Sequence, residues 1–379
     1  MKIRDFGVEI WMNAYENDCT YNLAETCVRS LSVGELLDLS GQGQAVVEEL
    51  LAARLTYGDI EGSPRLRRAI AGLYEKQRPE DITVTNGAIG ANALVMLTLV
   101  EPGDRVISVL PTYQQHYSIP ESIGAAVDIL PLREENGWLP DPEELRELVR
   151  KAGGRVKLIS INNPNNPTGS VMEEPLLRRL AEIAREAGAW LLCDEVYRGL
   201  CHQGEPYTVS VADLYEKGIS TGSMSKTYSL AGLRLGWIAG PRELWQLLSR
   251  QRDYHIISVG RIDDLLAAVA LESREAISRR NLAICREGGR LLEEFVAGQA
   301  HISYVKPKGG TTAFLKYDLP MASADLCRKL QRETGVMLLP GSALDREGYL
   351  RIGYCNDPAV TKTGLELFDR WLNEQAKGV

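Results

Sequence analysis

Between about Thr83 and Gly240, short apolar runs alternate with longer amphipathic stretches, and this order constrains the fold more than any other feature of the chain. The apolar runs are rich in β-branched residues and end at turn formers, as strands buried on both faces do. The stretches between them have the length and period of helices. We therefore predict an α/β domain with a mostly parallel sheet that helices cover on both faces. The predicted strands are 82–87, 105–111, 156–162, 191–196 and the region around 223–240, and the predicted helices are 91–100 and 176–190.

Beyond Trp245 the pattern changes to long charged helical segments followed by short strands. This mixture predicts a smaller α+β domain at the C-terminus, with which we expect the first residues of the chain to pack. The predicted division is an N-terminal segment at 1–45, a large domain at 46–270 and a small domain at 271–379.

Charge and cysteine content narrow the class of function. The 379 residues carry a formal net charge of −8, which disfavours nucleic-acid or anionic-membrane surfaces because both need clustered Lys and Arg. No stretch approaches the roughly 20 apolar residues of a membrane span, and the N-terminus lacks a secretory signal. The seven cysteines show no CxxC pair and no zinc-type spacing. We expect a cytoplasmic protein with reduced thiols that acts on small molecules, with no metal, nucleic-acid or membrane partner.

The segment SMSKTYSLAGLRLGW at 223–237 combines a lysine, two serines and an arginine directly after a predicted strand. Ligands bind at the carboxyl ends of strands in such sheets. A lysine amine becomes a nucleophile when it is desolvated or lies near another cation, since both lower its pKa. The alternative is that Lys226 is a solvated surface lysine and that Arg234 lies near it in the sequence by chance.

The same segment resembles the lysine motif of the class I and II aminotransferases, which are fold-type I pyridoxal-phosphate enzymes. The resemblance implies that Lys226 carries the cofactor in an imine bond and moves a proton. It also implies that Ser223, Ser225 and Arg234 bind the cofactor phosphate. Further matching motifs follow in the order of the family from Tyr57 onward.

Two polar segments that follow predicted strands match this family as well. LLCDEVYRG contains Asp194 and Tyr197, and NNPNNPTGS contains Asn166. Without the resemblance, Asp194 is an aspartate of the kind common at turns and helix caps, and the segment around Asn166 is a loop rich in turn formers. The resemblance implies that Asp194 keeps the pyridine nitrogen protonated, so that the ring can accept electrons. Tyr197 and Asn166 would bond to the phenolic oxygen of the cofactor, and Asn166 would also lie at the substrate.

TNGAIGANAL places Gly87, Ala88 and Ile89 where a predicted strand passes into a helix. Free backbone N–H groups at a helix N-terminus favour an anion, although a glycine turn alone is weak evidence. The resemblance implies contacts from these three residues to the phosphate. It also implies that Tyr113 stacks on the cofactor ring, whereas an aromatic at such a place more often only packs. We do not assign a base role to His116, because Lys226 fills it.

Two more distant residues complete the resemblance. Tyr57 lies in YGDIEGSPRLRRAIAGLY and is either an ordinary loop tyrosine or, as the resemblance implies, a phosphate ligand across a dimer interface. The second alternative predicts a homodimer with shared active sites. Arg351 can bind a carboxylate through two hydrogen bonds. It is either a surface ion-pair residue or, by resemblance, the residue that binds the substrate α-carboxylate.

The implied reaction moves an α-amino group between an amino acid and a 2-oxo acid. The chain departs from the common pattern at 21–31, where the Gly-rich element of many relatives is missing and Glu25 and Thr26 stand instead. We expect both at the substrate, with a capped helix start as the alternative. Leu344 stands where many relatives have Phe. Such positions usually help to form the side-chain pocket, so the resemblance does not identify the substrate.

Segments 252–264 and 307–314 resemble those of capreomycidine synthases, which use the same cofactor to cyclise a hydroxylated arginine. A β-elimination, replacement or cyclising enzyme for a basic amino acid is therefore the alternative function. The acidic Glu9, Asp18 and Glu25 would suit a cationic substrate, or they are simply solvated. A non-catalytic cofactor-binding module is disfavoured by the intact set of lysine, aspartate and arginine and by the lack of a DNA-binding segment.

Overall fold

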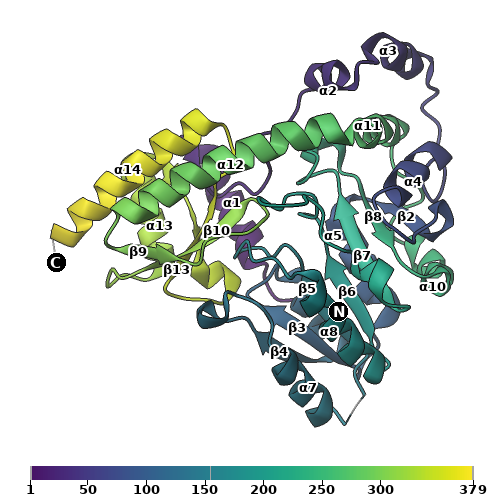
Figure 1. Cartoon of the computed structure of the whole chain (residues 1–379), viewed down its shortest axis with the longest axis horizontal. Helices are drawn as coiled ribbons and strands as arrows, with labels where there is room; N and C mark the ends of the chain where they lie inside the picture. The colour runs from purple at the N-terminus through teal and green to yellow at the C-terminus, as the bar shows by residue number, and fades with distance from the viewer. Residues whose placement is uncertain (1, 154, 378–379) are drawn as a thin grey trace.

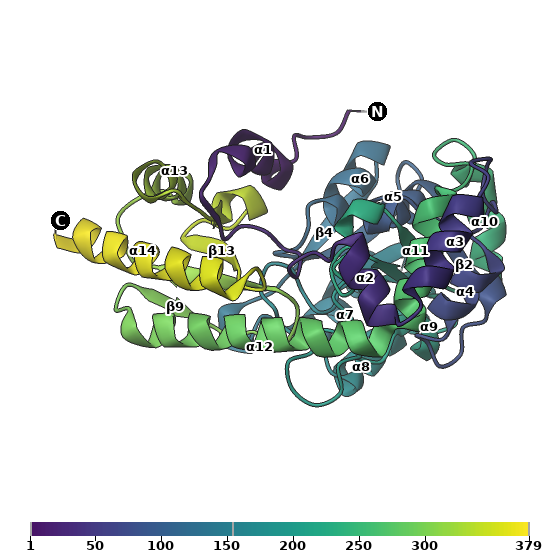
Figure 2. The same ribbon diagram turned by 90° about the horizontal axis from the view of Figure 1, so that it is seen from above.

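The computed structural model describes residues 2–153 and 155–377 of the chain. A large twisted sheet and a small sheet lie in opposite halves of the molecule, and the long helix α12 (Arg274–Gly298) runs along both (Figure 1). The two termini lie on different sides of the molecule (Figure 2).

The large sheet has seven strands in the order β2-β8-β7-β6-β5-β3-β4. Only β8 is antiparallel to its neighbours, β2 and β7, whereas the other pairs are parallel. The predicted mostly parallel sheet is therefore confirmed; the analysis of the sequence missed the edge strand β4. The strand bounds are β2 (Ile82–Thr85), β3 (Arg105–Leu110), β4 (Ala126–Pro131), β5 (Leu158–Asn162), β6 (Trp190–Asp194), β7 (Gly218–Ser223) and β8 (Gly236–Ala239).

Helices cover both faces of this sheet, as predicted (Figure 2). In α8, the residues Leu177, Leu180, Ala181 and Ala184 recur at helical spacing and are buried, while the charged residues between them face solvent. One face carries α5 (Gly87–Leu99), α6 (Gln115–Ile123) and α10 (Arg242–Arg252), and the other carries α7 (Pro142–Lys151), α8 (Glu174–Glu186) and α9 (Val211–Leu214).

The small sheet is antiparallel, in the order β12-β13-β10-β9, and packs with α13, α14 and part of α12. The N-terminal strand β1 (Tyr21–Asn22) pairs with β11 (Val336–Met337), and α1 (Gly7–Tyr15) contacts β12. The chain start thus lies beside C-terminal elements. Their bounds are β9 (Ile302–Tyr304), β10 (Thr312–Tyr317), β12 (Leu339–Pro340), β13 (Tyr349–Gly353), α13 (Ser323–Thr334) and α14 (Pro358–Lys377).

A second group of helices, α2 (Val33–Ser40), α3 (Gly43–Ala52), α4 (Pro64–Ala71) and α11 (Arg261–Glu272), lies at the far end of the large sheet (Figure 1). Both α2 and α4 pack on α11. The domain boundaries at residues 45 and 270 stay a prediction. In the described part of the chain, no helix has the length and apolarity needed to cross a membrane. The short 3-10 helices are η1 (Glu16–Asp18), η2 (Pro79–Asp81), η3 (Glu134–Asn136), η4 (Ala231–Leu233) and η5 (Gly341–Leu344).

Candidate functional site

A cavity of about 410 Å³ lies where the carboxyl ends of β5, β6 and β7 meet the N-terminal segment. Most residues that the sequence singled out come together here, although they span the chain from Glu25 to Arg351. The predicted residues that line the cavity are Glu25, Thr26, Ala88, Ile89, Tyr113, Asn166, Asp194, Tyr197, Ser223, Ser225, Lys226, Arg234 and Arg351.

Asp194 ends β6, and its carboxylate is held on both oxygens. The side-chain amide of Asn92 donates to Oδ2 at 2.8 Å, and the backbone N–H of Val196 donates to Oδ1 at 3.1 Å. His116 Nε2 lies 3.5 Å from Oδ2, and Nδ1 of the same buried ring bonds to Ser160 at 2.7 Å. The sequence analysis missed Asn92 and His116 as partners of this aspartate. The one available indication was a polar Asn92 inside an otherwise apolar helix.

The opposite end of the cavity is built to hold an anion. The N-terminus of α5 has no side-chain cap, so its first N–H groups are available. Gly87 has a φ of +68°, and a Cβ there would lie 3.0 Å from Arg234 Nη2, so the arginine fits closely against the glycine. Arg234 Nη1 lies 3.5 Å from the Ser225 hydroxyl. Among the described residues, no carboxylate lies within 4.0 Å of Arg234.

Lys226 follows β7 and is half-buried among polar groups. Its Nζ donates to Thr26 Oγ1 at 2.6 Å and to Cys27 Sγ at 3.3 Å. Burial lowers the pKa of Lys226, but the charges of Cys27, Tyr197 and Glu25 outweigh it and raise the pKa above its ordinary value. Burial likewise raises the pKa of the Cys27 thiol. Cys27 is a neighbour of this amine that the sequence did not indicate.

Glu25 is the lining carboxylate on which this amine acts. One of its oxygens accepts the backbone N–H groups of Thr26 at 2.7 Å and Cys27 at 2.8 Å. Burial raises the pKa of Glu25, but Lys226 and these N–H groups lower it below its usual range. Glu25 and Thr26, which we predicted at the substrate, both line the cavity, and their part in substrate binding stays a prediction.

Arg351 on β13 is 2% exposed and faces the cavity from the small sheet. Its Nη2 donates to the carbonyl of Ala24 at 3.0 Å and its Nη1 to Asn166 Oδ1 at 3.3 Å, while Nε has no partner. Within the described ranges, no carboxylate lies within 4.0 Å of the guanidinium. Burial lowers its pKa. A buried cation without a counter-ion is costly, and an incoming carboxylate would relieve that cost.

Two tyrosines line the cavity between these ends. The hydroxyl of Tyr113 donates to Glu9 at 2.7 Å, and its ring packs against Phe6 with centroids 4.7 Å apart. Tyr197 is buried, and burial raises its pKa. Residues of α1 thus form one wall of the cavity; the sequence had pointed only to Glu9 among them, and Asp18, named with it, does not line the cavity.

Gly87 lies against Arg234 but does not itself line the cavity, and two further predicted residues lie away from it. Tyr57, on the loop between α3 and α4, is 74% exposed and does not line the cavity of its own chain. Leu344 is fully buried in η5 and is not a lining residue either. The described residues hold no group of three or more His, Cys, Asp and Glu suited to a metal ion.

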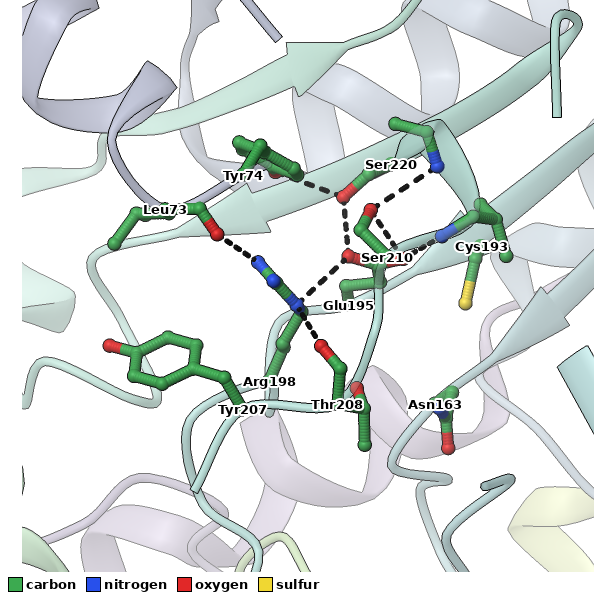
Figure 3. Close-up of polar contacts among 12 residues, drawn as sticks. Leu73, Tyr74, Asn163, Cys193, Glu195, Arg198, Tyr207, Thr208, Ser210 and Ser220 are labelled. Carbon is green, nitrogen blue, oxygen red and sulfur yellow. Dashed lines mark hydrogen bonds and ion pairs between the residues drawn. The ribbon is translucent and has the colours of Figure 1, made fainter. Parts of the chain in front are cut away.

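A buried polar network behind the cavity fixes the turn that follows Asp194 (Figure 3). Glu195 accepts hydrogen bonds from the hydroxyls of Ser210 at 3.0 Å and Ser220 at 2.8 Å, and it lies 3.8 Å from Arg198. Arg198 also donates to the backbone carbonyls of Leu73 and Thr208. This network ties the turn after β6 to β7, to the end of α4 and to the loop before α9.

Replacing Glu195 with alanine is expected to lower the free energy of unfolding by about 3 kcal/mol, because it leaves Arg198 buried without its counter-ion. The side chains of Glu195 and Arg198 are only 3% and 10% exposed. Urea unfolding measures the change, and the exposed Glu205→Ala variant is the matched control. Equal midpoints for the two variants would contradict this account of the network.

Comparisons with known proteins agree on one family. The model of the family described as aminotransferase class I and II matches residues 28–366. The chain is 30% identical over 375 residues to a capreomycidine synthase of Streptomyces vinaceus, which covers 98% of this chain and 94% of the relative. It is 31% identical over 309 residues to an aspartate aminotransferase of Pyrococcus horikoshii, and this match covers 79% of this chain and 78% of the relative.

Solved structures show the same likeness. A PLP-dependent aminotransferase from Streptococcus suis superposes with a TM-score of 0.95 and 43% identity, and the match covers 99% of both chains.

Proposed function

Because the chain belongs to the class I and II aminotransferase family, we propose that it moves an α-amino group from an amino acid to a 2-oxo acid. Pyridoxal phosphate is the cofactor of the enzyme. One observation carries the proposal: a half-buried lysine, a carboxylate fixed on both oxygens and a buried arginine without a described counter-ion line a single cavity. These are Lys226, Asp194 and Arg351.

The residues present fit pyridoxal phosphate. The uncapped N-terminus of α5, the Ser223 and Ser225 hydroxyls and the unpaired Arg234 offer donors to a phosphate. Asp194, at the other end, offers a carboxylate to a ring nitrogen. The remaining groups are proposed to bind the ring between these ends: Tyr197 and Asn166 at its phenolic oxygen and Tyr113 at its face.

When bound, the cofactor draws electrons from the substrate α-carbon and so makes its proton acidic. In our proposal Asp194 holds the ring proton that this requires, and the hydrogen bond from Asn92 orients its carboxylate. Lys226 must first lose a proton to become a nucleophile. In our proposal its Nζ later removes the α-proton, while Arg351 binds the α-carboxylate and keeps the α-carbon in place.

A second candidate function is elimination, replacement or cyclisation at the β-carbon of a basic amino acid. It is favoured by the 30% identity to a capreomycidine synthase over nearly the whole of both chains. The same lysine, aspartate and arginine would serve it, because both reactions begin with removal of the α-proton.

Transfer of labelled nitrogen separates the two functions. The protein is incubated with pyridoxal phosphate, pyruvate or 2-oxoglutarate, and each common amino acid labelled with ¹⁵N, and the products are analysed by mass spectrometry. The proposal expects ¹⁵N in alanine or glutamate together with the 2-oxo acid of the donor. Labelled ammonia or a cyclic product, without label in the acceptor, would replace amino transfer with the second function.

We also propose that the protein is a homodimer whose sites are shared. Exposed apolar side chains gather on two neighbouring segments, which the hydrogen bond from Gly58 N–H to Ser258 Oγ holds together at 3.1 Å. An exposed apolar patch of this kind is typical of an interface between proteins. Its members are Leu51, Leu55, Tyr57, Ile60, Tyr254, Ile257 and Ile262.

A shared site predicts a specific effect at Tyr57, which the dimer would bring to the phosphate of the other chain. Tyr57→Phe should raise the dissociation constant of pyridoxal phosphate about tenfold, because it removes one hydrogen bond to a charged group. Absorbance titration of the cofactor into the protein measures this constant. Tyr254→Phe removes a hydroxyl from the same surface and should change nothing; equal constants for the two variants would refute the role of Tyr57.

A further inference from the structure

The cavity contains more carboxylates than the proposed chemistry uses. Its cations are Lys226, Arg234 and Arg351, and each has a role with the cofactor or the α-carboxylate. The carboxylate of Asp194 also has a proposed role, at the ring nitrogen of the cofactor. Three further lining carboxylates, those of Glu9, Glu16 and Glu25, have no such role.

Lys226 acts on Glu25 and lowers its pKa, so the lining carboxylates left without a cationic partner in the described structure are those of Glu9 and Glu16. Glu9 accepts the hydroxyl of Tyr113 and Glu25 accepts two backbone N–H groups, which are neutral donors. In the described structure, no Lys, Arg or His nitrogen lies within 4.0 Å of any of the three. Burial, followed by the charges of Glu25 and Glu9, raises the pKa of Glu16. The three charges therefore act on one another across the same cavity.

An independent observation places a ligand against them. Arg351, 2% exposed and with an unpartnered Nε, faces the same cavity and lacks a counter-ion. A substrate that puts its carboxylate on Arg351 must direct the rest of its length elsewhere in the cavity. Val8 and Met12 of α1 line it beside Glu9 and Glu16 and give an apolar wall for a methylene stem.

We propose that the substrate is an amino acid whose aliphatic side chain ends in a cation, an ammonium or a guanidinium, and that Glu16 and Glu9 bind that cation. The inference rests on the proposed function, since that function puts the α-carboxylate on Arg351. Charge-assisted hydrogen bonds then neutralise the unpaired carboxylates. An acidic side chain meets repulsion instead, because the cavity has no further cation to receive it.

Three probes of equal length test the charge preference without turnover: 6-aminohexanoate, hexanoate and adipate. All carry the carboxylate for Arg351, none has an α-amino group, and they differ only in the cationic, neutral or anionic far end. Calorimetry on the protein saturated with pyridoxal phosphate gives their dissociation constants. We expect 6-aminohexanoate to bind about tenfold more tightly than hexanoate, and adipate more weakly than both.

Variants of single residues test which carboxylates cause the preference for the cationic probe. Glu16→Gln and Glu9→Gln should reduce the advantage of 6-aminohexanoate over hexanoate and leave hexanoate itself unchanged. Asp18→Asn is the matched control, because Asp18 lies in the same 3-10 helix as Glu16, is exposed and does not line the cavity. It should keep the full advantage.

The inference is overturned if hexanoate or adipate binds as tightly as 6-aminohexanoate, if none of the three binds, or if neither glutamine variant reduces the advantage. Failure of the proposed function has a different signature. In that case the ¹⁵N experiment shows no transfer from any donor, while the preference for the cationic probe and its dependence on Glu16 persist.

Discussion

Lys226→Ala should lower the rate of amino transfer by about 10⁴-fold or more, because it removes both the nucleophile that binds the cofactor and the group that moves the α-proton. No second lysine lines the cavity to replace Lys226, because the other lining cations are Arg234 and Arg351. Steady-state assay of the 2-oxo acid product measures the loss.

Two further variants make this prediction specific. Lys226→Arg keeps the positive charge beside Glu25 and Thr26 but not the nucleophile, so it should be as inactive as the alanine variant. Lys151→Ala removes an exposed lysine of α7 and should have the activity of the unaltered protein. Substantial activity in Lys226→Arg would mean that charge, not bond formation, is the contribution of this residue.

Asp194→Asn should reduce kcat by about 10³-fold, since an amide cannot hold the ring nitrogen in its protonated form. The variant is nearly isosteric and keeps an acceptor for the N–H of Val196. Its melting temperature should therefore stay close to that of the unaltered protein, which separates the chemical effect from unfolding.

The conservative variant and a neighbour test the same point. Asp194→Glu keeps the charge and should recover part of the lost rate. Asn92→Ala removes one orienting bond and should cost less than Asp194→Asn, because the carboxylate remains. A kcat in Asp194→Asn equal to that of the unaltered protein would contradict the role of this aspartate.

The parts of the fold and site that lie in contiguous segments were predictable from the sequence. Lys226, with its serines and Arg234, lies within a dozen residues, so local spacing and the strand before it placed all of them together. The parallel sheet was predictable for a similar reason, because strands such as β5 and β6 are short, mostly apolar runs. The edge strand β4 is only partly buried and contains Asp128, which hid it.

Contacts that depend on distant packing were not predictable. His116 approaches Asp194 only because the fold brings α6 close to the end of β6. Glu9 reaches Tyr113 only because α1 folds back across the cavity, a contact between residues 104 positions apart. Strands of two residues such as β1 and β11 have no periodicity to detect. The role proposed for Tyr57 requires a second chain, and no local sequence pattern shows where that chain lies.

Chemical identification of the lysine that holds the cofactor decides whether Lys226 is the reactive residue. The protein is loaded with pyridoxal phosphate, reduced with borohydride so that the covalent link survives, digested and analysed by peptide mass spectrometry. The account predicts a phosphopyridoxyl group on the peptide that contains Lys226, one per chain. Attachment to another lysine, with the Lys226 peptide unmodified, would contradict it.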